Sequence, residues 1–324
     1  MNKKILITGG CGFIGLNFVN YILKNKKKIS LRILDNFSNK NKKRVSKILD
    51  AIGFKETEGC QIIEGDIRDK KICKKSLEGV DEVVHLAANT GVNQSMKDPI
   101  SDLNNNILGT LNLLECSRNT NIEHFVMASS GAPIGLGHPP FNEKKLPKPI
   151  SPYGASKLSA EAYCHVYSKS FGIKTTILRF SNVYGPYSFH KTSVISSFLK
   201  NIILKKQITI FGNGSQTRDF IYVDDLISAI VQSSRNKESG GIYHIATQKE
   251  SSINRIIQIL KKEFHEKEDY SINVKKLDKR IGDVQRNFAT INKAKKNLKF
   301  KPKISLVCGI RKTIDNFIEY KKYL

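Results

Sequence analysis

The feature that most constrains the fold is a glycine-rich turn close to the start of the chain. Gly9, Gly12 and Gly15 stand between a short apolar run, which predicts a strand, and an amphipathic stretch, which predicts a helix. Glycine here permits a tight turn and lets backbone N–H groups approach a pyrophosphate, whose charge is also favoured at a helix N-terminus. Asp35 stands 20 positions after Gly15, at the end of the second predicted strand, and can accept hydrogen bonds from an adenosine ribose. Because this carboxylate would repel a 2′-phosphate, we expect NAD rather than NADP.

Strand-like and helix-like patterns alternate through the first half of the chain. Strands are predicted for the runs rich in β-branched and apolar residues at 5–8, 31–34, 61–63, 82–86, 125–129 and 175–180. Amphipathic helices are predicted at 13–24, 42–52, 71–77, 103–118 and 153–171. This alternation is typical of an α/β fold with a doubly wound parallel sheet, the Rossmann type.

The regularity weakens after Asn182, which predicts a smaller mixed α/β lobe. We assign residues 1–180 and about 219–247 to an NAD-binding domain, and about 181–218 and 248–324 to a domain that binds the substrate.

The composition adds a strong positive charge, +25 in 324 residues. A basic surface attracts nucleic acids, but the lysines are spread along helix faces and loops without interleaved aromatic residues or a recognisable binding motif. We therefore interpret the charge as a solvated lysine-rich surface and expect no specific nucleic-acid partner.

Neither a membrane span nor a metal site is predicted. No apolar run approaches the roughly 20 residues that a transmembrane helix needs, and we interpret the apolar N-terminal run as a strand rather than a signal peptide. The six cysteines are scattered, without a CxxC pair or a histidine spacing suited to zinc. We expect reduced thiols in a cytoplasmic protein.

Tyr153 and Lys157 form a candidate acid/base pair, because residues four apart on a helix share a face. Chance alone supplies roughly two tyrosines with a basic residue at i+4 in a chain of this composition, and Tyr187 with Lys191 is a second match. The context separates the two pairs. Ser151 and Pro152 predict the N-cap and first position of a helix carrying Tyr153, whereas Tyr187 follows a proline in a turn-like stretch. We therefore set the second pair aside.

The chain resembles the extended short-chain dehydrogenase/reductases, and among them the nucleotide-sugar epimerases of the UDP-glucose 4-epimerase group. The resemblance covers nearly the whole chain and rests on several motifs in family order. These are the glycine turn, His85 to Ala88, Asn106 with Gly109-Thr110, Ser129-Ser130, Tyr153 to Lys157, Arg179 to Pro186, Arg218 to Phe220, Val223 to Leu226, and Arg280 with Gly282-Asp283.

The resemblance implies a role for each matching residue. Tyr153 would be the general acid/base, Lys157 would bind the nicotinamide ribose and lower the tyrosine pKa, and Ser130 would hydrogen-bond the substrate hydroxyl. Asn106 would hold either the tyrosine-bearing helix or a water. Beyond Tyr153 and Lys157, the cofactor would contact Gly9, Gly12, Phe13, Ile14, Gly15, Asp35, Asn36, Asp66, Ile67, Leu86, Ala87 and Ala88. Asp66 is equally suited to cap a helix. Beyond Ser130, the nucleotide sugar would contact Asn182, Val194, Thr209, Phe211, Arg218, Arg280, Asp283 and Asn287.

The implied reaction is the NAD-dependent 4-epimerisation of a UDP-hexose through a 4-keto intermediate, in a homodimer joined by the helices at 103–118 and 153–171. Two departures from the family pattern bear on this. Pro133 and Ile134 stand where the family commonly has a tyrosine before a glycine, which leaves the aim of Ser130 open. Asn287 stands where a bulky aromatic residue can narrow the sugar pocket, so we expect room for an N-acetyl group.

Three alternatives stay open to different degrees. A 4,6-dehydratase is disfavoured, because such enzymes carry an acidic pair where this chain has Gly131 and Ala132. A UDP-glucuronate 4-epimerase or decarboxylase remains, since no residue settles whether a carboxylate is bound. A catalytically silent NAD-binding or nucleic-acid-binding protein is a remote alternative that the high charge suggests.

Overall fold

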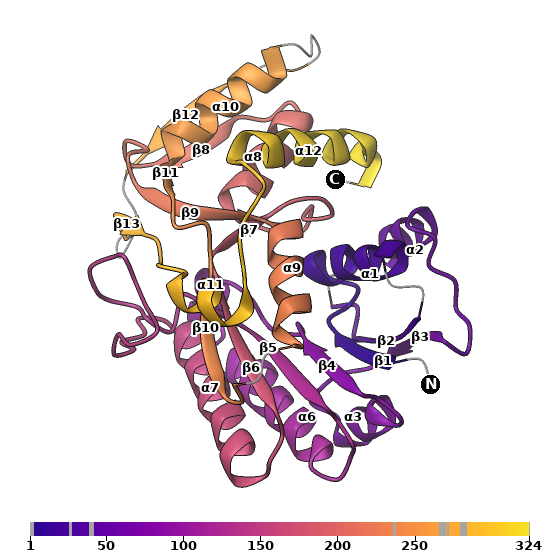
Figure 1. Ribbon diagram of the computed structural model, residues 1–324. Coiled ribbons are helices and arrows are strands. Elements are labelled where there is room, and N and C mark those ends of the chain that lie inside the picture. Colours follow the sequence, from indigo (N-terminus) through magenta and orange to yellow (C-terminus); the bar gives the residue numbers. More distant parts are fainter. Residues whose placement is uncertain are drawn as a thin grey trace.

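The large sheet of this computed structural model is parallel throughout (Figure 1). The structure describes residues 3–25, 28–38, 42–235, 238–265, 270, 272–278 and 284–323. Seven strands follow the order β3-β2-β1-β4-β5-β6-β10. They are β1 (Lys3–Thr8), β2 (Ile29–Asp35), β3 (Cys60–Glu64), β4 (Glu82–His85), β5 (His124–Ser130), β6 (Thr175–Phe180) and β10 (Gly241–Ile245). The predicted doubly wound α/β fold is confirmed, and each predicted strand lies within two residues of an observed one.

Helices cover both faces of this sheet and form a separate apolar core on each. On β1, Ile5 and Ile7 pack into one core, and Leu6 packs into the other, because successive side chains of a strand point to opposite faces. The first core includes residues of α1 (Phe13–Asn25), α2 (Lys42–Ala51) and α9 (Val223–Ser233). The second includes residues of α3 (Lys70–Leu77), α6 (Gly109–Ser117) and α7 (Pro152–Ser170). In Figure 1, α1 and α9 accordingly lie on one side of the strands and α3, α6 and α7 on the other.

The predicted helix at 103–118 has a more complex form. It begins earlier, as α5 (Pro99–Leu103), widens into a π-helical turn, η1 (Asn104–Leu108), and continues as α6. A further short helix, α4 (Val92–Lys97), precedes it and was not predicted. Both α4 and α5 pack against α7.

The smaller lobe lies beyond the carboxyl ends of the large sheet (Figure 1). One small sheet joins β7 (Asn182–Tyr184), β9 (Thr217–Tyr222), β11 (Glu250–Ser252) and β13 (Arg286–Asn287), and a second pairs β8 (Ile208–Phe211) with β12 (Val274–Leu277). The helices nearby are α8 (Val194–Ile203), α10 (Ile253–His265), α11 (Asn292–Leu298) and α12 (Leu306–Glu319), followed by a short 3₁₀ turn, Lys321–Tyr323. A mixed α/β lobe is thus present, while the exact division into two domains stays a prediction.

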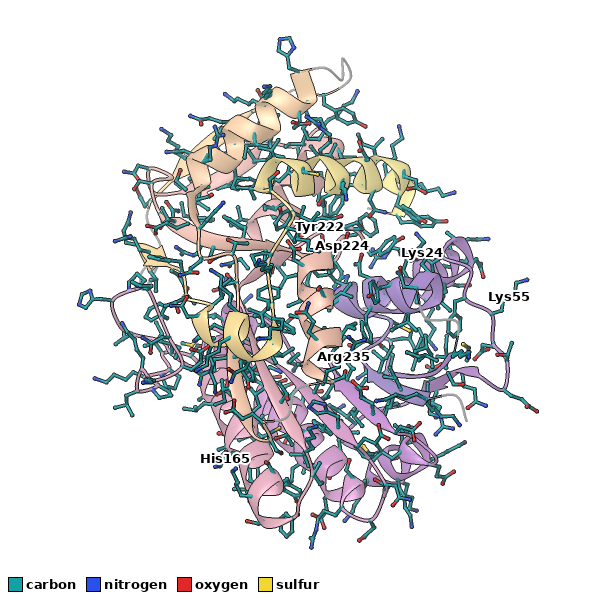
Figure 2. All side chains as sticks on the ribbon, in the orientation of Figure 1. Lys24, Lys55, His165, Tyr222, Asp224 and Arg235 are labelled. Atoms are coloured by element: carbon teal, nitrogen blue, oxygen red, sulfur yellow. The ribbon has the colours of Figure 1, made fainter. Side chains whose placement is uncertain are left out.

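Basic side chains are spread over the molecule. Lys24, Lys55 and Arg235 are exposed and belong to three separate parts of the fold (Figure 2). Within the described ranges, no helix combines the length and the apolar character that crossing a membrane requires.

Candidate functional site

A cavity of about 430 Å³ opens at the carboxyl ends of β1, β2, β4, β5 and β6. This is where ligands bind in open parallel sheets. Most of the predicted site residues line it: Gly9, Gly12, Phe13, Ile14, Gly15, Asp35, Asn36, Ile67, Leu86, Ala87, Ala88, Ser130, Tyr153, Lys157 and Asn182. The structure therefore brings the predicted cofactor residues and the predicted acid/base pair to one place.

The glycine turn needs glycine for two different reasons. A Cβ at Gly9, where φ is +67°, would lie 2.8 Å from the backbone nitrogen of Ala87, and one at Gly15 would lie 2.5 Å from the Cα of Gly10. Close backbone packing thus excludes side chains at both positions. Gly12 differs, since a Cβ there would approach only the Gly9 carbonyl oxygen, at 3.2 Å, and the residue faces the cavity. A cradle left open at Gly12, at the N-terminus of α1, fits the pyrophosphate of a dinucleotide.

Asp35 closes the turn from the neighbouring strand. Its two carboxylate oxygens accept hydrogen bonds from the backbone N–H groups of Cys11 (2.9 Å) and Phe37 (2.8 Å). Burial raises the carboxyl pKa, and these hydrogen bonds oppose the rise. The position at the tip of β2 fits the predicted ribose contact.

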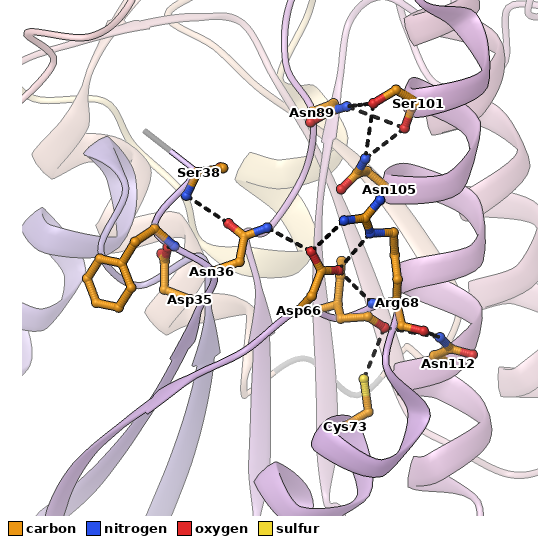
Figure 3. A network of polar contacts seen from close by, with 12 residues as sticks. Asp35, Asn36, Ser38, Asp66, Arg68, Cys73, Asn89, Ser101, Asn105 and Asn112 are labelled. Atoms are coloured by element: carbon orange, nitrogen blue, oxygen red, sulfur yellow. Dashed lines mark hydrogen bonds and ion pairs between the residues drawn. The ribbon is translucent and has the colours of Figure 1, made fainter. Parts of the chain in front are cut away.

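Asp66 lies just outside the cavity wall in a polar network with Asn36 and Arg68 (Figure 3). Asn36 donates a hydrogen bond to its carboxylate at 2.9 Å, and Arg68 pairs with both carboxylate oxygens. These hydrogen bonds, chiefly those from Arg68, lower the Asp66 pKa to about 2. The alternative of a cap for the following helix is wrong, because Asp69 is the N-cap of α3.

The candidate acid/base pair lies at the start of α7, as predicted. The Ser151 side chain accepts a hydrogen bond from Gly154 N and caps the helix, and proline occupies the first turn. Lys157, one turn after Tyr153, is buried and donates a hydrogen bond to the carbonyl oxygen of Ala128 at 3.0 Å. This contact fixes α7 against the end of β5, the strand that carries Ser130.

Burial controls the two pKa values. It raises the pKa of Tyr153 to about 12, although a hydrogen bond with Ser130 lowers it in part. Burial lowers the pKa of Lys157 to about 8, although Asp102 opposes the change. The protein alone therefore holds Tyr153 protonated, contrary to the expected lowering by Lys157. Only a further positive charge near the phenol, such as an oxidised nicotinamide ring, would favour the phenolate.

Asn106 does not line the cavity but is fully buried in the π-helical turn η1. Its side chain accepts a hydrogen bond from Asn89 N at 2.8 Å and donates to the Ser156 hydroxyl and the Asp102 carboxylate, both at 3.1 Å. Of the two predicted uses, holding the tyrosine-bearing helix is the one that this geometry favours. Asn106 is thus placed as a positioning residue rather than one that touches the substrate.

The unusual loop after Ser130 is accommodated without loss of packing. Ile134 is buried in the main core, with 1% of its surface exposed, so an apolar side chain replaces the expected phenol. The backbone N–H of Ile134 bonds to the carbonyl oxygen of Gly131, and Lys148 N bonds to Ile134 O. The Ser130 hydroxyl accepts a hydrogen bond from Ala132 N at 3.2 Å and still lines the cavity.

The predicted substrate residues that the structure describes, apart from Ser130 and Asn182, lie outside this cavity, on the smaller lobe. Arg218 is half-buried and donates to the carbonyl oxygens of Thr217 and Val284, at 2.8 and 2.7 Å. Asn287 is the register partner of Arg218 across the β13–β9 ladder. Thr209 and Phe211 lie on β8, and Val194 begins α8. Arg280 and Asp283 lie outside the described residues.

Several residues on the cavity wall were not predicted. They are Asn89, Thr90, Gly91 and Asn105, and His190, Lys191, Thr192 and Ser193 after β7. Lys191 belonged to the pair set aside with Tyr187, which does lie in a turn, at φ +63°. The sequence contained a signal that Lys191 lies near the site, because this residue stands only five positions after the motif ending at Pro186.

Known proteins are similar to this chain in sequence and fold over almost its full length. Residues 5–246 match the family described as NAD dependent epimerase/dehydratase. A protein of Methanocaldococcus jannaschii with the provisional name UDP-glucose 4-epimerase is 37% identical over 320 residues, 96% of this chain and 97% of that protein.

Two solved structures extend the comparison to bound ligands. The UDP-N-acetylglucosamine 4-epimerase of Methanobrevibacter ruminantium, in complex with UDP-N-acetylmuramic acid, has a TM-score of 0.88 and 31% identity, covering 98% of this chain and 99% of that one. The UDP-glucuronic acid 4-epimerase of Bacillus cereus, in complex with UDP-glucuronic acid and NAD, has a TM-score of 0.89 and 33% identity, covering 99% of this chain and 100% of that one.

Proposed function

The chain belongs to the NAD-dependent epimerase/dehydratase family, and we propose that it inverts C4 of a UDP-hexose through a 4-keto intermediate while its NAD stays tightly bound. The observation that carries this proposal is the meeting of Ser130, Tyr153 and Lys157 on the wall of the cavity that the glycine turn closes. A hydroxyl, a phenol and an ammonium group beside a nicotinamide site suit proton removal from a sugar hydroxyl coupled to hydride transfer.

Each catalytic side chain has a separate role in the proposed reaction. Bound NAD would serve as the acceptor of the C4 hydride and, once reduced, as its donor. Tyr153 accepts the proton of the 4-hydroxyl and later returns it, and Ser130 holds the same oxygen by a hydrogen bond. Lys157 carries a positive charge at neutral pH, because its pKa of about 8 lies above 7. Its ammonium group binds the nicotinamide ribose, and the positive charge of the oxidised cofactor is what would favour the tyrosine phenolate.

Epimerisation further requires that the keto sugar turns over between the two hydride transfers. We assign the nucleotide to residues of the smaller lobe, so that the diphosphate is held firmly and the hexose loosely. The proposed contacts are Asn182, Val194, Thr209, Phe211, Arg218, Arg280, Asp283 and Asn287. The fork of an arginine guanidinium suits phosphate oxygens, to which it donates two hydrogen bonds at once.

The cavity favours epimerisation over dehydration. Eliminating water from C5 and C6 requires further acid and base groups near the sugar, and Gly131 and Ala132 supply none. Among the described residues that line the cavity, the only carboxylate is Asp35, which lies on the adenosine side. Asn287 in place of a bulky aromatic residue supports acceptance of N-acetylated sugars as well.

A panel of nucleotide sugars tests the proposal. The enzyme is incubated with UDP-glucose, UDP-N-acetylglucosamine, UDP-glucuronate and dTDP-glucose, and the products are identified by NMR. Formation of UDP-galactose or UDP-N-acetylgalactosamine supports the proposal. Turnover of UDP-glucuronate alone, or a 4-keto-6-deoxy product from dTDP-glucose, would replace it with the corresponding alternative.

We further propose that the protein is a homodimer. Large apolar side chains are exposed along one continuous set of packed helices, α4, α5, η1 and α7. They are Val92, Met96, Ile100, Leu103, Leu108, Tyr163 and Val166. Such a face is costly in water and is typical of a contact between subunits. Light scattering should give twice the chain mass, and Ile100→Asp with Val166→Asp should reduce it to that of the monomer.

The thiols fit the cytoplasmic location that we propose. All six cysteines are unpaired, and Cys11, Cys73 and Cys164 are buried. Free thiols are typical of a reducing compartment.

A further inference from the structure

The segment of residues 185–193 joins β7 to α8, and its last four residues line the cavity. We call it the strap. At its start, the Asn17 side chain of α1 donates a hydrogen bond to the carbonyl oxygen of Pro186 at 2.9 Å. In its middle, Tyr187 N donates to the Asn316 side chain at 2.8 Å, and Phe189 is buried against Phe317. These contacts hold the strap in place.

Near its end, the strap contacts the segment that follows β4 through one side chain. The Lys191 ammonium donates a hydrogen bond to the Thr90 hydroxyl at 2.9 Å. Thr90 belongs to the segment that follows β4 and contains Ala87 and Ala88, and α1 begins at the glycine turn. The strap thus joins two elements that both line the cofactor cavity.

The charge balance of the cavity is uneven. Lys191 is half-buried, and burial lowers its pKa with no carboxylate nearby to oppose the change. Lys191 in turn contributes to the lowering of the Lys157 pKa. His190 beside it is neutral, since its pKa is about 3. Along the described cavity wall the one carboxylate, Asp35, is already bonded to two backbone N–H groups.

Among the described residues, the one hydrogen-bond partner of the half-buried Lys191 ammonium group is a neutral hydroxyl, and such a group is costly to bury unless an anion joins it. The nucleotide sugar is one source of such an anion, but among its described proposed contacts only Ser130 and Asn182 line this cavity. We favour the dinucleotide, because every one of its proposed contacts except Asp66 lines the cavity that Lys191 also lines.

We propose that Lys191 binds a pyrophosphate oxygen of NAD, and that the strap thereby retains the cofactor between turnovers. The glycine turn supplies backbone N–H groups from α1, and Lys191 supplies a full positive charge from a different element. The inference deepens the proposed function, in which the hydride must return to the sugar that gave it. If the cofactor dissociated in mid-reaction, the 4-keto sugar could not be reduced again.

Cofactor binding, measured apart from turnover, tests the proposal. The protein is stripped of NAD, and the dissociation constants for NAD and for UDP are measured by calorimetry for the wild type, Lys191→Met and Lys191→Arg. Lys206→Met is the matched control, because Lys206 is exposed and lies beyond α8. We expect Lys191→Met to weaken NAD about ten- to hundredfold, the range for losing a charge-assisted hydrogen bond. Lys191→Arg should keep most of the affinity, and UDP should bind all four proteins alike.

Unchanged NAD affinity in a folded Lys191→Met protein would overturn the proposal, and so would a loss of UDP affinity alone. If Lys191→Met does not fold, Thr90→Val replaces it, since it removes the hydroxyl that positions the ammonium group. That variant should then release NAD severalfold faster on gel filtration than the wild type, and equal release would count against the strap. Because no arm uses turnover, failure of the epimerase assay leaves this result standing.

Discussion

The cofactor side and the substrate side of this molecule differ in how their binding residues come together. On the cofactor side, every predicted contact except Asp66 lines one cavity at the ends of the parallel strands. On the substrate side, the predicted residues are scattered over β7, β8, β9, β13 and α8, which belong to two small sheets and a separate helix. Among the described members of that set in the smaller lobe, only Asn182 lines the same cavity.

The difference reflects how the elements that carry each set of residues are arranged. In a parallel sheet the carboxyl ends of all strands meet at one edge, so local strand–turn–helix units suffice to assemble a site. In the smaller lobe the described residues come from two small sheets and a separate helix, so the site depends on how these elements pack against one another. Variants on the two sides should therefore separate NAD binding from UDP-sugar binding.

The largest effect is expected where the two sides meet, at Tyr153. Tyr153→Phe removes the phenol that moves the proton, and kcat should fall by about 10² to 10⁴. NAD affinity should stay within about twofold, because the ring still fills its place. Tyr163→Phe, an exposed tyrosine on the same helix, is the control. Turnover followed by NMR, with cofactor content measured by chromatography, checks both statements, and a Tyr153→Phe enzyme with near-normal kcat would refute the acid/base role.

Gly12→Val should weaken NAD binding without affecting UDP binding. The added side chain would point into the cavity rather than into protein, so the fold should persist while NAD affinity drops at least about hundredfold. UDP should bind as before if the substrate side is assembled independently. Calorimetry with each ligand separates the two effects, and a thermal melt checks the fold. Parallel loss of UDP binding would show that the two sides are coupled.

The cofactor side could be predicted from the sequence because its signals are local. Gly9, Gly12 and Gly15 and the following helix are one continuous segment, and Asp35 is fixed by the length of a single strand–helix–strand unit. The catalytic helix was equally accessible, since Ser151 and Pro152 mark its start. These elements are confirmed with boundaries shifted by no more than two residues.

What escaped prediction depends on tertiary packing. The π-helical turn at Asn104–Leu108 carries no sequence signal of its own, yet it contains the buried Asn106. Asp69 rather than Asp66 caps α3, a choice between two carboxylates that spacing alone does not make. Lys191 reaches the cavity only because Phe189 and Tyr187 anchor the strap to α12. Spacing to Tyr187 could not show this.

Arg218→Leu should affect the substrate side alone. Losing a guanidinium that holds phosphate costs about ten- to hundredfold in KM for the UDP-sugar, with kcat and NAD affinity little changed. Arg218→Lys keeps the charge but not the fork, so its KM should lie between the two. Arg286→Leu is the matched control on the neighbouring strand, since it removes an ion pair with Glu250 and a contact with the Phe288 ring but no proposed phosphate contact. Steady-state kinetics would contradict the assignment if Arg218→Leu and Arg286→Leu behaved alike.

Asn287→Tyr should change the choice of sugar rather than the affinity for the nucleotide. A ring in that position would fill the room proposed for an N-acetyl group, so kcat/KM for UDP-N-acetylglucosamine should fall about tenfold relative to UDP-glucose. Asn287→Ala, which keeps the room, should leave the ratio unchanged. An equal fall for both sugars would instead point to disturbed packing against Arg218.

The smallest expected effect is a pH dependence confined to the cofactor side. The pKa of Lys157, lowered by burial to about 8 from its ordinary 10.5, means that its charge is lost as the pH rises through 8. NAD affinity should therefore weaken a fewfold between pH 7 and 9, at most about tenfold per unit for one proton, while UDP affinity stays level.

The contribution of Lys157 to the free energy of unfolding should change in the opposite direction and increase with pH. Between pH 8 and 10.5 the unfolded chain binds more protons at this lysine than the folded one, so this group makes unfolding harder as the pH rises. Calorimetry and thermal melts of the wild type and Lys157→Met at each pH isolate both trends, because the difference between the two proteins removes the contribution of the other titrating groups. A wild type whose NAD affinity does not differ in pH dependence from that of Lys157→Met would show that the lysine charge has no part in holding the cofactor.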